Sequence, residues 1–160
     1  MKETQRVGMA DLAVASAPEV LMTIGLGSCI GVALYDSIVR VGGLAHVMLP
    51  KSNGPLVSNP AKFADTALPL LIRKMGDQGA QKQRLTAKLA GGAQMFKLER
   101  ATDTMRIGAR NLEAIVEWLE KERIPIVAQD TGGNWGRTVK LDTENGDFLV
   151  RTIAHGEKRL

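Results

Sequence analysis

Cysteine and histidine are scarce in this chain of 160 residues, which has one cysteine and two histidines. A single cysteine excludes an intrachain disulfide. Cys29, His46 and His155 are the only soft metal ligands, and their wide separation in sequence argues against a four-ligand zinc site. A lone thiol is typical of a reducing compartment. We therefore expect no metal site, and the cytosol as the location.

Aromatic residues make up only 4% of the chain, and long apolar runs are missing. Few aromatic rings leave few platforms for stacked bases, and the basic residues behind the net charge of +4 are scattered, so no nucleic-acid partner is expected. No apolar run approaches the roughly 18 residues that cross a bilayer, and the N-terminus lacks the apolar core of a signal peptide. The sequence thus predicts a cytoplasmic protein that is not inserted in a membrane.

Short apolar runs predict a mixed α/β domain. Strands are expected at 20–24, 30–35, 41–49, 85–89, 124–128, 137–141 and 148–153, and helices at about 59–76 and 108–123. Asn145-Gly146, between the last two strands, is a strong hairpin signal. The irregular order of strands and helices favours an α/β sandwich of two or three layers with a mixed sheet over a doubly wound parallel sheet. We expect one domain over residues 1–153 and a flexible C-terminal tail over 154–160.

Two glycines, Gly25 and Gly27, stand just before Cys29. A dinucleotide-binding turn would need a third glycine where Ile30 stands, and the following residues predict a strand instead of a phosphate-binding helix, which excludes that site. Glycines before a thiol allow a sharp turn with uncovered N–H groups, an arrangement that suits a nucleophile and a developing oxyanion. The structural alternative is a buried cysteine in a glycine-rich hairpin.

His46 lies in an apolar run, where packing does not require a polar ring. If 30–35 and 41–49 pair in antiparallel fashion across a turn at Asp36-Ser37, Cys29 and His46 come to the same end of the pair. The imidazole would then activate the thiol, either as an ion pair or by taking its proton. Thr23 could orient the imidazole through its hydroxyl. The structural alternatives are a core histidine bonded to a backbone carbonyl and a threonine that packs in a strand.

Several longer blocks of the sequence resemble the CheD family of chemoreceptor glutamine deamidases. These blocks are Thr23–Cys29, Ala45–Pro50, Phe63–Ala67, Ala87–Phe96, Ile107–Asn111 and Asp130–Arg137. The likeness runs in order from about Val7 to Ile153. It implies an α/β sandwich that resembles the catalytic domain of deamidating toxins. It also implies Cys29 as the nucleophile, His46 as the base and Thr23 as the orienting residue.

The resemblance further implies the reaction: a protein-glutamine glutaminase, which converts selected glutamines on the cytoplasmic helices of chemotaxis receptors to glutamate through a cysteine thioester. Gly27 and Ser28 are expected at the oxyanion and Gln94 at the substrate, and no cofactor is required. Two alternatives stay open within the family: a receptor glutamyl methylesterase, and a binding module for a CheC-type phosphatase with catalysis secondary. A cysteine peptidase would use the same pair of residues. Trp135 and Arg137 would form part of a docking surface or close the last hairpin.

Overall fold

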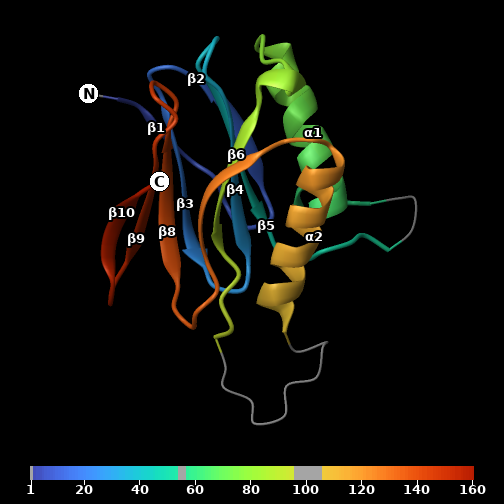
Figure 1. Ribbon diagram of the computed structural model, residues 1–160, viewed down its shortest axis with the longest axis vertical. Helices are drawn as coiled ribbons and strands as arrows, with labels where there is room; N and C mark the ends of the chain where they lie inside the picture. The colour runs from blue at the N-terminus through green and yellow to red at the C-terminus, as the bar shows by residue number, and fades with distance from the viewer. Residues whose placement is uncertain (1, 54–56, 96–105) are drawn as a thin grey trace.

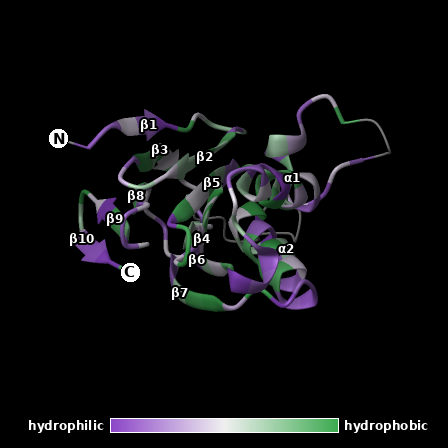
Figure 2. Cartoon of the chain, turned by 90° about the horizontal axis from the view of Figure 1, so that it is seen from above, coloured by the Kyte–Doolittle hydropathy of each residue, from purple (hydrophilic) through white to green (hydrophobic). Residues whose placement is uncertain are grey.

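The computed structural model describes residues 2–53, 57–95 and 106–160, and their elements form three layers (Figure 1). Two five-stranded sheets pack face to face, and two α-helices cover the outer face of one of them. The predicted α/β sandwich with mixed sheets is confirmed, in its three-layer form. Seen from above, both helices lie on the same side, so no described helix covers the other sheet (Figure 2).

Sheet A is the uncovered sheet, with strand order β1-β3-β8-β9-β10. Its strands are β1 (Thr4–Arg6), β3 (Val20–Leu26), β8 (Arg137–Asp142), β9 (Phe148–Thr152) and β10 (Gly156–Arg159). β1 runs parallel to β3, and the other pairs are antiparallel. Burial alternates along β8 and most of β3, because one face of the sheet packs on sheet B and the other meets solvent.

Sheet B is the central layer, with strand order β2-β5-β4-β6-β7. Its strands are β2 (Leu12–Ser16), β5 (Val41–Val47), β4 (Ile30–Asp36), β6 (Thr86–Gly91) and β7 (Ile126–Thr131). Only the β6–β7 pair is parallel. Every residue of β4 and β5 is buried, since sheet A covers one face and the helices cover the other.

The helices α1 (Ala64–Asp77) and α2 (Ile107–Lys121) each bury one face at three- and four-residue spacing. The buried residues are Ala64, Ala67, Leu68, Leu71 and Met75 in α1, and Gly108, Asn111, Ile115 and Leu119 in α2. α1 begins later than predicted. The Asn59 side chain caps the short 3-10 helix η1 (Pro60–Lys62) instead, and α1 follows it. Another 3-10 helix, η2 (Lys82–Arg84), precedes β6.

Two hydrophobic cores hold the layers together. One lies between sheet B and the helices and includes Leu34 and Leu71, and the other lies between the sheets and includes Leu26, Phe148 and Cys29. Burying one large apolar side chain contributes about 1.5–3 kcal/mol. Because Cys29 belongs to the second core, the packing of the two sheets also sets its position.

The sequence does not predict three of the strands. β1 and β2 precede the first expected strand, and β10 falls within 154–160, the expected flexible tail. That expectation is wrong for residues 156–159, which pair in antiparallel fashion with β9. All four β10 residues are exposed, so no apolar alternation marks this strand, and its backbone hydrogen bonds hold it in place. Phe96, in one block of the resemblance, lies outside the described residues.

Candidate active site

Strand β3 ends in a turn that leads to residues 27–29, the Cys29 loop. Gly25 has a φ of +77°, in the left-handed region that glycine adopts without strain. The Gly27 N–H then donates to the Gly25 carbonyl (3.1 Å). β4 begins directly after Cys29. The glycine turn predicted before the thiol is therefore present.

The carbonyl groups of the Cys29 loop are bonded to neighbouring segments. The Gly27 carbonyl accepts from Ala93 N (2.8 Å), and the Cys29 carbonyl accepts from Gly92 N (2.9 Å). The Ser28 carbonyl accepts from Asn111 Nδ2 (3.0 Å). The N–H and C=O groups of one trans peptide point in opposite directions. Holding the carbonyls of residues 27 and 28 therefore turns the N–H groups of Ser28 and Cys29 away from these donors. In the described part of the chain, neither N–H group has a hydrogen-bond partner outside its own residue.

Gly91, at the end of β6, packs closely against this loop. Its φ is +111°, and a Cβ atom at this position would lie 2.2 Å from the Cys29 carbonyl oxygen. No other residue fits here without moving the backbone. The glycine at position 91 thus lets sheet B pack directly against the Cys29 loop.

Two hydrogen bonds join Val7, Thr23 and His46 inside the sandwich. Thr23 Oγ1 lies 2.7 Å from the Val7 carbonyl oxygen and 2.7 Å from His46 Nδ1. A carbonyl only accepts, so the one hydroxyl proton of Thr23 goes to Val7, and His46 must donate its Nδ1–H to Thr23. This network assigns the neutral tautomer in which His46 Nε2 carries the lone pair.

Burial favours the neutral forms of both Cys29 and His46. Cys29 is 7% exposed, and His46 is fully buried. Burial raises the pKa of the Cys29 thiol, partly opposed by its own backbone N–H, and burial lowers the pKa of the His46 imidazole. Of the two ways to activate the thiol, the electrostatics favour proton transfer to a neutral imidazole over a resting ion pair.

Cys29 and His46 come to the same end of the β4–β5 pair. The predicted antiparallel pairing of these strands is confirmed, and His46 lies opposite Gly31, two residues after Cys29. The two side chains are not hydrogen-bonded to each other, because His46 Nε2 has no partner among the described residues. The resting structure therefore leaves unused the one nitrogen that could take a proton.

Gln94 lies at the surface, beyond the end of β6. Its backbone N–H donates to the Gly133 carbonyl (2.9 Å), which joins this segment to the glycine pair after β7. The structure thus places Gln94 on an exposed segment two residues after Gly92, whose N–H holds the Cys29 carbonyl.

Asn111 on α2 is the residue that the sequence interpretation overlooked. It is fully buried, and its Nδ2 donates to the carbonyls of Ser28 (3.0 Å) and Met48 (2.8 Å). Its position in the helix was the one sign in the sequence that could have pointed to this residue. Asn111 shares the buried helix face with Ile115 and Leu119, where an apolar residue is expected.

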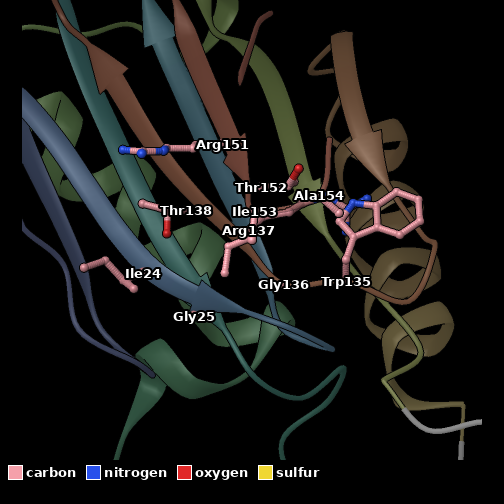
Figure 3. A pocket seen from close by; sticks show the side chains of 10 residues that line it. All are labelled: Ile24, Gly25, Trp135, Gly136, Arg137, Thr138, Arg151, Thr152, Ile153 and Ala154. Atoms are coloured by element: carbon pink, nitrogen blue, oxygen red, sulfur yellow. The ribbon is translucent and has the colours of Figure 1, made fainter. Parts of the chain in front are cut away.

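A groove of about 520 Å³ lies on sheet A beside this site (Figure 3). Its lining includes Ile24, Gly25, Trp135, Arg151 and Ile153. Among residues 2–53, 57–95 and 106–160, no group of three or more histidine, cysteine or acidic side chains could hold a metal ion.

Comparisons with known proteins identify the family of the chain. A sequence model of the family described as CheD chemotactic sensory transduction matches residues 48–152. The chain belongs to the CheD family. One relative, from Syntrophomonas wolfei, carries the name probable chemoreceptor glutamine deamidase CheD and is 54% identical over 99% of both chains. Another of that name, from Caldanaerobacter subterraneus, is 55% identical over 96% of this chain and 95% of its own.

A third CheD relative, the chemoreceptor glutamine deamidase CheD of Halalkalibacterium halodurans, is 48% identical over the full length of both chains. The segment matched by the CheD family model begins after Thr23, Cys29 and His46, whereas the full-length relatives span all three positions. In the described segments of this CheD chain, no helix combines the length and the hydropathy needed to span a membrane.

Proposed function

We propose that this chain is a glutamine deamidase of chemoreceptors, with Cys29 as the nucleophile, His46 as the base and Thr23 as the residue that orients His46. The names of the full-length relatives support the reaction class. One observation carries the residue assignment: the Val7–Thr23–His46 network. It leaves the lone pair of a buried imidazole unused at the strand end next to the only cysteine.

In the proposed first step, the Cys29 thiol gives its proton to His46 Nε2 while the sulfur attacks the carboxamide carbon of a receptor glutamine. The C–S bond forms, and the carbonyl oxygen becomes an oxyanion. The unpaired N–H groups of Ser28 and Cys29 are the candidate donors to this oxygen. The intermediate then collapses as the C–N bond breaks, and His46 returns the proton to the nitrogen, which leaves as ammonia.

A water molecule completes the proposed reaction. His46 Nε2 takes a proton from the water while the water oxygen attacks the thioester carbon. The C–S bond then breaks, and the same proton returns to sulfur. One water is consumed and one ammonia is released, which leaves a glutamate side chain and a free Cys29 thiol. Thr23 keeps the ring nitrogen in the same orientation through both steps.

The proposed chemistry needs the Cys29 sulfur and His46 Nε2 to come within hydrogen-bonding reach when substrate binds. They are not bonded in the resting structure, and such contacts commonly tighten only in the substrate complex. The lowered pKa of His46 supports the role of base, because it keeps the imidazole neutral at physiological pH.

The family resemblance extends the proposal to location and partners. It supports the cytoplasm as the compartment, the cytoplasmic helices of the receptors as the substrate, and a CheC-type phosphatase as a regulatory partner. The chemistry at Cys29 does not depend on that phosphatase.

Peptide mapping by mass spectrometry tests the reaction on a chemoreceptor cytoplasmic fragment incubated in heavy-oxygen water. The wild-type protein should convert specific glutamines to glutamates that contain one solvent oxygen, with the backbone intact. Cys29→Ser and His46→Gln should abolish the conversion. Ser37→Ala is the control, because this exposed turn residue lies at the opposite end of β4.

The other outcomes separate the competing activities. Cleaved backbone would indicate a peptidase, and loss of receptor methyl groups without any change of glutamine would indicate a methylesterase. Conversion that survives Cys29→Ser would contradict the assignment of the nucleophile.

A further inference from the structure

The outer face of sheet A carries mainly basic and apolar side chains. Two of the rows of paired residues that cross this face make up the surface that we call the basic face. One row contains Arg6, Met22, Lys140, Leu149 and Arg159, and the other contains Thr138, Arg151 and Glu157. Together they hold four basic side chains and one acidic side chain. A neighbouring row of Thr4, Val20 and Asp142 adds one carboxylate, which pairs with Lys2, and Arg159 pairs with Asp147 (3.5 Å). No described helix covers them (Figure 2).

The groove at one end of the basic face has apolar walls (Figure 3). Ile24 is 40% exposed and Ile153 is fully exposed. Trp135 is held in place by its neighbours: its ring centre lies 4.1 Å from that of His155 and 5.3 Å from the Arg137 guanidinium carbon. Exposed apolar side chains around a fixed aromatic ring are typical of surfaces that bind proteins.

Arg151 supplies the basic charge of this groove that forms no ion pair with a described residue, although Glu157 lies opposite it on β10. Arg137 also lines it but is already paired with Asp130 (3.1 Å). In the described part of the chain, Arg151 takes part in no ion pair, and no described carboxylate lines the groove. A partner that complements this surface must therefore bring negative charge.

The groove adjoins the candidate active site along β3. Successive residues of a strand point to opposite faces, so Ile24 faces the groove while its neighbour Thr23 faces inward and bonds His46. Gly25 lines the groove and begins the turn to the Cys29 loop. A chain bound in the groove would therefore lie next to the reacting residues.

We propose that the groove and the basic face bind an acidic segment of the protein substrate, next to the glutamine that reacts. An apolar side chain of this segment packs among Ile24, Trp135 and Ile153, and a carboxylate pairs with Arg151. A polypeptide fits better than a small molecule, because the basic surface continues along the sheet beyond the groove. The identity of the substrate rests on the proposed function, whereas the surface itself does not.

Steady-state deamidation of a receptor cytoplasmic fragment tests this proposal. Arg151→Glu should raise KM by about tenfold or more with little change in kcat, because repulsion replaces an attraction. Ile153→Ser should raise KM to a smaller extent. Arg73→Glu is the matched control, since it makes the same charge change on α1 at the opposite side of the molecule, and it should alter KM by less than about twofold. Alkylation of Cys29 by iodoacetamide, without substrate, should be unchanged in all three variants.

A KM for Arg151→Glu no higher than that for Arg73→Glu would overturn the proposal. Slower alkylation of Cys29 in Arg151→Glu would also overturn it, because the change would then act on the thiol itself. Anionic vesicles that bind the wild type but not Arg151→Glu, with fragment binding unchanged, would assign the face to a membrane. If the wild type does not deamidate the fragment, the proposed function fails, and protection of Cys29 from alkylation by the fragment still tests the docking surface.

Asn111 carries a second, independent inference. One amide group bonds the carbonyl of Ser28, which precedes Cys29, and the carbonyl of Met48, which follows His46 by two residues. The two protons of Nδ2 match these two acceptors. Oδ1 stays buried without a partner in the described structure, an arrangement that is costly and that an apolar residue would avoid.

We infer that Asn111 is a positioning residue, which holds the segments of Cys29 and His46 at a fixed separation and turns the Cys29 N–H away from the Asn111 amide. Asn111→Asp keeps the shape but places an acceptor against two carbonyls. It should lower kcat at least tenfold, a loss of about 1.4 kcal/mol of transition-state stabilisation, with KM unchanged, and it should alter the pH profile of Cys29 alkylation.

The matched control for this inference is Ile115→Ala, one helical turn further along the same buried face. It should lower the melting temperature and leave kcat and the alkylation profile unchanged. Asn111→Ala removes the amide without adding a charge and should behave like Asn111→Asp. Normal kcat in both Asn111 variants, or an equal loss of kcat in Ile115→Ala, would overturn the inference. So would failure of both Asn111 variants to fold, because Asn111 would then support the fold and not the site.

Discussion

Replacing Thr23 with valine tests the assigned proton arrangement most directly. Valine has nearly the shape of threonine, so the packing is retained while the hydroxyl is lost. Thr23 is fully buried, and its hydroxyl contacts the Val7 carbonyl and His46 Nδ1 at 2.7 Å each. The substitution therefore leaves one acceptor and one donor unpaired in the interior.

The structure sets the size of the stability effect and of the kinetic effect. Each unpaired buried group costs about 1–3 kcal/mol, so the two groups left by Thr23→Val should lower the free energy of unfolding by about 2–6 kcal/mol. The kinetic effect has a separate cause. Without an acceptor at Nδ1, the His46 ring can take the tautomer that is protonated on Nε2, which cannot accept the thiol proton. Because general base catalysis contributes about 10²–10⁴-fold, kcat should fall by about 10²-fold or more.

Urea unfolding followed by the fluorescence of Trp118 and Trp135 measures the first effect, and deamidation kinetics measure the second. Thr23→Ser keeps the hydroxyl, so it should retain most of kcat while losing about 1 kcal/mol of stability with the methyl group. Full activity of Thr23→Val, or an equal loss in the serine and valine variants, would refute the assigned network.

Three further predictions follow from burial and close packing. Alkylation of Cys29 by iodoacetamide should still be accelerating at about pH 9, because burial raises the thiol pKa above its ordinary value; an acidic plateau would instead indicate a thiolate–imidazolium pair. Burial in the folded state lowers the pKa of His46, so below about pH 6.5 the unfolded chain binds a proton at His46 that the folded chain does not bind. The free energy of unfolding should therefore decrease as pH falls through about 6.5, by at most about 1.4 kcal/mol per pH unit. Urea titrations should show this slope in the wild type and its loss in His46→Gln. Gly91→Ala should displace the Cys29 carbonyl and abolish turnover, since the new Cβ would lie 2.2 Å from that oxygen. Gly76→Ala in α1, where a Cβ meets nothing within 4 Å, should leave activity intact and gain up to about 1 kcal/mol.

Local patterns predicted the elements whose side chains repeat with a clear period. The apolar face of α1 and the β8–β9 hairpin around Asn145-Gly146 follow from spacing and turn chemistry alone. The same patterns could not predict β10, whose side chains are all exposed and whose place depends on backbone bonds to β9. They also missed Asn111, because nothing local distinguishes a structural amide on a helix face from one that bonds two distant carbonyls.

The sequence by itself determined which chemistry is available: one thiol, a histidine within an apolar strand, and a glycine turn that frees the backbone before Cys29. Only the tertiary structure decided how these groups are used. The direction of the Thr23 hydroxyl depends on Val7, 16 residues away, and the orientation of the Cys29 N–H depends on Asn111, whose amide bonds Ser28 across 83 residues. The neutral state of the thiol and the imidazole depends on burial between two sheets. Desolvation and hydrogen bonding are set by residues that meet only when the chain is folded, and no local pattern contains them.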